Sequence, residues 1–141
     1  MAACARQLLL DAGVEVPEGR IIERAGLIDG IGMFADRVAE ALTTEHPRWH
    51  FDGGAISPAA LDWLMHRGAW IANLRTARGT VHAVIVDKEE GGIVHVRDPW
   101  GVKGPGSGCG TKATMRRADI QVAWDMALDK VVFAAREKEE R

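Results

Sequence analysis

Apolar residues in the first third of the chain recur at the three- and four-residue spacing of an α-helix. Residues 3–12 predict a helix that ends at Gly13, since glycine readily takes the left-handed conformation that closes many helices. Residues 18–25 predict a second helix that ends at Gly26. The apolar stripe of a third helix is formed by Phe34, Val38, Ala41 and Leu42.

Local capping chemistry predicts a fourth helix. Ser57 is a typical N-cap residue, and Pro58 fits the first helical position because its missing N–H is not needed there. Leu61, Leu64 and Met65 supply the buried stripe, and Gly68 ends the helix.

Beyond Gly68 the pattern changes to short β-branched segments bounded by turn residues, which are typical of strands. The predicted strands are residues 69–76, 81–87, 92–98 and 129–135. A further helix is predicted over 116–126. Helices followed by antiparallel strands favour an α+β domain in which the helices pack against one sheet.

A hairpin brings together two residues with chemistry. The strands 81–87 and 92–98 are joined by KEEGG, and with the turn centred on Glu90, positions whose numbers sum to 180 face each other. His82 then lies opposite Asp98, and any even sum keeps both side chains on one face of the sheet. A histidine held by a carboxylate is the base and orienting group of a nucleophilic triad. The alternative is a surface cross-strand pair worth about 0.5 kcal/mol.

Cys4 is the candidate nucleophile. It stands in the first turn of the first predicted helix, where unpaired N–H groups and the helix dipole lower the pKa of a thiol. Its spacing of four residues to Leu8 is equally typical of a buried packing residue. Cys109 lies in the glycine-rich segment GPGSGCG without a neighbouring base, which predicts an exposed cysteine with no catalytic role.

Composition narrows the classes of function. A chain of 141 residues, 47% hydrophobic and 27% charged, is typical of one packed domain. The net charge of −2 gives no support for nucleic-acid binding, and the apolar runs are shorter than the roughly 18–20 residues that span a bilayer. Two cysteines exclude a disulfide scaffold, and the histidines lack a metal-ligand spacing. We therefore predict no metal and no cofactor.

The order of these features resembles the papain-like cysteine peptidases, with a cysteine on the first helix, a histidine strand, and a following strand that ends in Asp98-Pro99. Within them, the chain is most similar to the bacterial leader-peptide (bacteriocin-processing) peptidase domains and the related papain-fold toxin and effector domains. The resemblance covers residues 1 to about 134. Its segments are AACARQLLLDAG at 2–13, LDWLMHRGAWIANL at 61–74, VHAVIVD at 81–87, VHVRDPWG at 94–101 and RRADIQVAWDMALDKVVF at 116–133.

The resemblance implies a papain-like domain over residues 1–135. The remaining residues 136–141, REKEER, have no apolar partner, which predicts a charged, solvated tail. It also implies cysteine-dependent hydrolysis of peptide or side-chain amide bonds, so proteolysis and glutamine deamidation would share the same residues. The implied catalytic residues are Cys4, His82 and Asp98, with Trp100 beside the substrate.

The position of the nucleophile is open between two alignments. In the leader-peptide peptidases a second, non-catalytic cysteine follows the nucleophile by four residues, and counting back from Gly13 places Cys4 on that second cysteine, with the nucleophile before Met1. In the plant papain pattern the second cysteine is catalytic, which favours Cys4. The glutamine of the family's oxyanion hole lies upstream of the nucleophile and has no counterpart here, because Gln7 lies downstream. The alternative function is a catalytically inactive papain-fold module, or a truncated fragment, that binds a peptide or a partner protein.

Partners and location follow from the same resemblance. We expect a peptide or protein substrate, no nucleic acid and no membrane insertion, with a larger parent protein or an inhibitory immunity protein as further partners. The chain as it stands has no secretion signal, which predicts a cytoplasmic location. The alternative is an exported domain of a larger bacterial protein.

Overall fold

The computed structural model describes residues 1–26, 33–75, 79–99 and 111–139. Its helices are α1 (Ala2–Asp11), α2 (Glu18–Ala25), α3 (Ala35–Glu45), the 3₁₀ turn η1 (Pro58–Ala60), α4 (Leu61–Met65) and α5 (Arg117–Asp125). Its strands are β1 (Trp49–Ala55), β2 (Trp70–Arg75), β3 (Val81–Glu90), β4 (Ile93–Asp98), β5 (Thr111–Arg116) and β6 (Lys130–Glu137). These strands form one antiparallel sheet in the order β1-β6-β2-β3-β4-β5, so the α+β class is confirmed.

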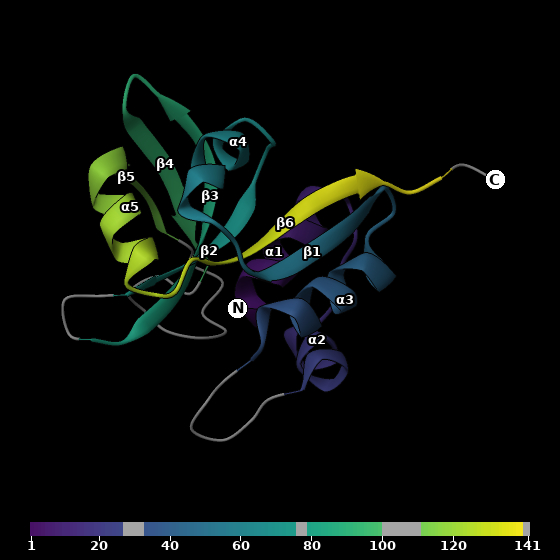
Figure 1. Ribbon diagram of the computed structural model, residues 1–141. Helices are drawn as coiled ribbons and strands as arrows, with labels where there is room; N and C mark the ends of the chain where they lie inside the picture. The colour runs from purple at the N-terminus through teal and green to yellow at the C-terminus, as the bar shows by residue number, and fades with distance from the viewer. Residues whose placement is uncertain (27–32, 76–78, 100–110, 140–141) are drawn as a thin grey trace.

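Helices cover both faces of this sheet. Figure 1 shows α1, α2 and α3 gathered near β1 and β6, and α5 beside β5. On the first face, α1, α2 and α3 bury a core against Ile71, Ile85 and Val132. On the second face, α4 and α5 pack against the neighbouring positions of the same strands, including Trp70 and Val86. The two cores follow from side-chain alternation, because successive residues of a strand point to opposite faces.

The predicted helices are confirmed, and their ends follow the expected chemistry. Gly13 and Gly26 have φ of 81° and 78°, in the left-handed region that glycine adopts without a steric penalty. The Ser57 Oγ accepts a hydrogen bond from the Ala59 N–H at 3.3 Å, which caps η1. The first turn of this predicted helix is 3₁₀, and α4 continues from it.

Two strands, β1 and β5, were not predicted. The sequence WHFDGGA of β1 contains two glycines, which are depleted in strands, yet Gly53 is required where α3 crosses. A Cβ at Gly53 would lie 2.3 Å from the Ala35 carbonyl oxygen, so only glycine permits this approach. β5 lies at the edge of the sheet and five of its six residues are exposed, which removes the alternation that signals a strand.

The C-terminal strand extends past the expected domain boundary at residue 135. β6 runs to Glu137, whose carboxylate accepts a hydrogen bond from the Arg48 Nε at 2.9 Å. The Lys138 ammonium donates to the carbonyl oxygens of Thr43 and His46 at 2.5 and 2.6 Å. Lys138 therefore closes the end of α3, while Arg136 and Glu137 are exposed, as the sequence predicted for this segment.

Among the described residues, none of the helices is long and apolar enough to cross a membrane.

Candidate functional site

The β3–β4 hairpin has a different register from the predicted one. Near its turn, Glu90 pairs with Ile93, so partner numbers sum to 183, whereas Val86 pairs with Val96, a sum of 182. The predicted sum of 180 is therefore wrong. The irregularity between Val86 and Lys88 is a bulge at Asp87 that turns an odd sum into an even one. An odd register carried to the end of the hairpin would send its two chemical residues to opposite faces.

The bulge leaves His82 and Asp98 on the same face, where they form a short contact. The His82 Nε2 lies 2.6 Å from the Asp98 Oδ2, and the two side chains are 37% and 26% exposed. With Nε2 bound to the carboxylate, the Nδ1 of the ring is the nitrogen left to accept a proton. The pair thus has the geometry of a base and its orienting carboxylate.

A pocket of about 140 Å³ lies beside this pair. Its wall joins the start of α1 to the ends of β3 and β4, and the lining residues are Met1, Ala3, Cys4, Val81, His82, Ala83, Asp98 and Pro99. The structure therefore brings Cys4, His82 and Asp98 to one pocket. Trp100 and Cys109, also considered from the sequence, lie outside the described residues.

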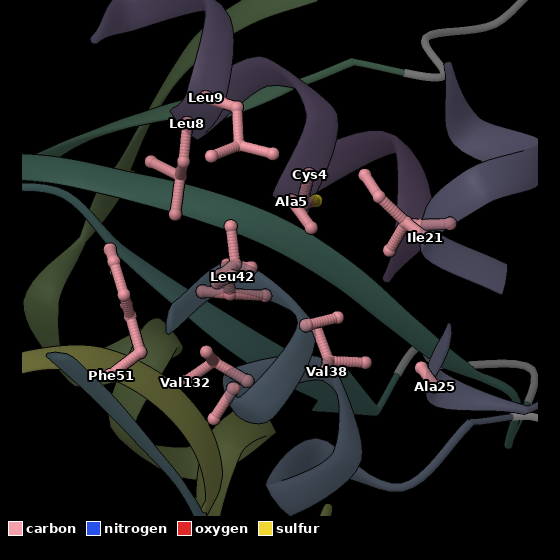
Figure 2. Close-up of a cluster of buried hydrophobic side chains, with 14 of the residues drawn as sticks. Cys4, Ala5, Leu8, Leu9, Ile21, Ala25, Val38, Leu42, Phe51 and Val132 are labelled. Carbon is pink, nitrogen blue, oxygen red and sulfur yellow. The ribbon is translucent and has the colours of Figure 1, made fainter. Parts of the chain in front are cut away.

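Cys4 reaches this pocket as a buried thiol. Figure 2 shows it among the apolar side chains between α1 and the sheet, and it is 2% exposed. The Sγ donates a hydrogen bond to the Ala83 carbonyl oxygen at 3.4 Å. Burial raises the pKa of Cys4 to about 12, opposite in direction to the lowering expected from the helix N-terminus.

The thiol and the imidazole lie on two sides of β3. The Ala83 side chain packs against the core that contains Cys4, and alternation along the strand turns the neighbouring His82 the other way. Within the described ranges, none of the hydrogen bonds joins the Cys4 Sγ to the His82 ring. In this state Cys4 is a protonated packing residue.

A guanidinium holds the bulge in place. The Arg97 Nε lies 2.7 Å from one Asp87 carboxylate oxygen, and the Arg97 Nη2 lies 2.8 Å from Asp11 at the end of α1. Hydrogen bonds with Asp11, then Asp87, raise the pKa of Arg97 further above its already high value. This network, which sequence reasoning missed, ties α1 to the hairpin that carries His82. In the sequence, this network is indicated only by Asp87, the acidic residue that ends the apolar run of β3.

A second pocket, of about 580 Å³, lies along β4 and β5. It is lined by Gln7, Asp87, Lys88, His95, Val96, Arg97, Asp98, Pro99, Thr111, Lys112 and Ala113. No group of three or more His, Cys, Asp or Glu side chains within the described ranges is arranged to hold a metal ion.

The comparison with solved structures finds the same α+β fold in a known peptidase domain. One similar structure is the peptidase domain of Streptococcus ComA, a bi-functional ABC transporter involved in a quorum sensing pathway. The TM-score is 0.68 at 13% sequence identity, and the match covers 96% of this chain and 90% of that one. No protein-family description matches the chain. No curated protein sequence matches it either. At this level of identity the likeness shows the fold.

Proposed function

We propose that this domain is a papain-like cysteine peptidase that hydrolyses amide bonds in peptides at the pocket beside His82. The observation that carries the proposal is the 2.6 Å contact between His82 on β3 and Asp98 on β4, in a pocket that the start of α1 also lines. A solved peptidase domain of the same fold adds support. The substrate class is a peptide or protein chain, and hydrolysis of a glutamine side-chain amide would use the same groups.

In the proposed reaction, His82 moves the proton and Asp98 holds His82. The thiol passes its proton to the imidazole, and the sulfur attacks the carbonyl carbon of the amide. The C–N bond then breaks, and the imidazolium returns the proton to the leaving amine. Water, deprotonated by His82, hydrolyses the thioester and releases the acid and the thiol. Asp98 stabilises the imidazolium and fixes the ring orientation throughout.

The proposal assigns the nucleophile to Cys4, the thiol that the described residues place at this pocket. The resting thiol must first leave the Ala83 carbonyl and lose its proton, which against a pKa of about 12 costs about 7 kcal/mol at pH 7. Because the thiol and the His82 ring lie on two sides of β3, attack also requires the first turn of α1 to shift, when a peptide enters, until the Sγ reaches the imidazole. Met1 provides no side-chain hydrogen bond to cap that turn, which lowers the cost of such a shift.

A second candidate function is peptide binding without catalysis. The burial of Cys4 favours it, because a protonated thiol that packs among Leu8 and Leu9 is a structural residue. In this reading the half-exposed His82–Asp98 pair supplies polar contacts to a bound peptide.

Turnover measurements separate the two candidates. The wild-type protein is incubated with a synthetic random peptide library, and new termini are counted by mass spectrometry. For the peptidase, His82→Ala and Cys4→Ala each lower the cleavage rate at least about 100-fold, the usual size of a lost acid–base group. His66→Ala, an exposed histidine at the end of α4, is the matched control and keeps the wild-type rate.

Each result decides one part of the proposal. Cleavage that survives His82→Ala refutes the base. Cleavage that needs His82 but survives Cys4→Ala assigns the nucleophile to another thiol, and the further change Cys109→Ala tests that one. Peptide binding without cleavage establishes the second candidate.

A further inference from the structure

Polar side chains join α1 to the sheet near its two ends. Cys4 in the first turn and Asp11 at the last residue are separated by about two turns of helix, so they lie on the same side of α1. Within the described ranges, the hydrogen bonds between α1 and the strands are those of these two residues. Between them, Leu8 and Leu9 pack in the apolar core.

The two links differ in strength. At the first turn, the Cys4 Sγ donates to the Ala83 carbonyl oxygen at 3.4 Å, and a thiol is a weak donor. At the last residue, the Arg97 Nη1 and Nη2 donate to the two Asp11 carboxylate oxygens at 3.2 and 2.8 Å, which is a bidentate, charge-assisted pair. The strong link is therefore at the C-terminal end of the helix, and the weak link is at the thiol.

Arg97 is itself held in one orientation. Its Nε and Nη2 donate to the two carboxylate oxygens of Asp87 at 2.7 and 2.8 Å, and its side chain is 20% exposed. It also directly precedes Asp98 on β4. The guanidinium thus connects the end of α1 to the strand that carries the partner of His82.

We infer that Arg97 is a positioning residue for Cys4: it holds the last turn of α1 in place, and the first turn opens and closes over β3 about that fixed end. The inference rests on the proposed function for taking Cys4 as the nucleophile, and it deepens that function by naming the contact that governs when the thiol is reachable. The ion pair with Asp11 carries it, because a helix with one strong and one weak attachment opens first at the weak one.

The rate at which iodoacetamide alkylates Cys4 tests this inference without any peptide cleavage. The reference is the folded Cys109→Ala chain at pH 8, in which Cys4 is the remaining thiol. Arg97→Gln should speed alkylation about tenfold, because a charge-assisted hydrogen bond that holds the helix is lost. Asp11→Ala should speed it by at least about threefold, a smaller effect because its carboxylate is partly exposed.

Two control variants separate this contact from other effects. Glu23→Ala removes an exposed carboxylate of α2 and should keep the reference rate. Arg67→Leu removes hydrogen bonds to β6 and weakens the fold as a whole, and it should leave the rate within about twofold. If Arg67→Leu speeds alkylation as much as Arg97→Gln does, Cys4 reacts through global unfolding and the inference is wrong.

A spectroscopic readout distinguishes positioning of α1 from damage to the hairpin. In Asp11→Ala, Arg97 still holds Asp87, so the ring ¹⁵N shifts of His82 should keep their wild-type values while alkylation of Cys4 speeds up. Unchanged alkylation in Asp11→Ala overturns the inference. Altered His82 shifts in this variant overturn it as well, because the change then acts on the hairpin.

Cleavage measurements keep the two proposals apart. Faster alkylation in Asp11→Ala, found together with no peptide cleavage by the wild type, refutes the peptidase and leaves the role of Arg97 standing. Peptide cleavage by the wild type, found together with unchanged alkylation in Asp11→Ala and Arg97→Gln, does the reverse.

Discussion

The buried state of Cys4 makes a quantitative prediction about its reactivity. The thiolate is the form that iodoacetamide alkylates, and burial raises the pKa of Cys4 from 9.0 to about 12. At pH 8 the thiolate fraction falls from about one in ten to about one in ten thousand, a factor of about 1000 that corresponds to about 4 kcal/mol. Folding should therefore slow the alkylation of Cys4 by about 1000-fold.

The assay uses the Cys109→Ala protein, in which Cys4 is the remaining thiol. Alkylation is followed by intact-mass spectrometry at pH 8, in the folded chain and in concentrated urea. The folded rate should also rise about tenfold per pH unit up to pH 10, because the thiolate fraction does so below the pKa. A folded rate within tenfold of the unfolded rate refutes the buried, protonated thiol. A rate that is high below pH 7 refutes it as well and indicates a thiolate paired with His82.

Three further predictions concern stability, each measured by urea unfolding. Gly53→Ala should destabilise the fold by at least about 2 kcal/mol, because the added Cβ would meet the Ala35 carbonyl oxygen. Gly19→Ala in α2 should stabilise the fold by about 0.5–1 kcal/mol, because there is open space around its Cβ. Equal effects of the two changes would contradict the close approach at Gly53. Arg67→Leu should cost about 2 kcal/mol, because the guanidinium donates to the Ala134 and Ala135 carbonyl oxygens at 2.7–3.2 Å, and a cost near zero would show that these bonds do not matter. Burial, then the charges of Lys138 and Arg48, lower the pKa of His46 below 6.5. The unfolded chain therefore takes up the proton first as the pH drops, and the free energy of unfolding should fall below about pH 6.5. His46→Asn should flatten this decline, and an unchanged slope would show that His46 does not cause it.

The local signals of the sequence predicted the elements that local chemistry decides. Helix ends at Gly13 and Gly26 and the cap at Ser57 follow from conformational freedom and a side-chain hydrogen bond within a few residues. Trp70 and Trp124, which lie within these elements, are 1% and 0% exposed.

The sequence predicted which strand residues carry the site, but not the strand register that brings them together. His82 and Asp98 do lie on one face as predicted, but only because the bulge at Asp87 corrects the odd register near the turn. The register was not accessible, because the bulge at Asp87 is held by Arg97 and by Asp11, which lies 86 residues away from that arginine. The contact between Arg97 and Asp11 joins residues too far apart in the sequence to produce a local pattern.

Cys4 shows a competition that sequence alone does not decide. The helix N-terminus favours a thiolate, and packing against the sheet penalises any charge. The spacing to Leu8 indicated that packing was possible, but only the position of α1 over β3 shows that desolvation dominates.

The measurement that tests the central claim most directly is the rate of peptide cleavage by the wild-type chain and by His82→Ala and Asp98→Asn. Both changes involve partly exposed side chains, so each folded variant should stay within roughly 1 kcal/mol of the wild-type stability. We predict that the wild type cleaves peptides, that His82→Ala loses at least about 100-fold of this rate, and that Asp98→Asn also loses most of it. Equal cleavage by all three proteins, or none by the wild type, would contradict it.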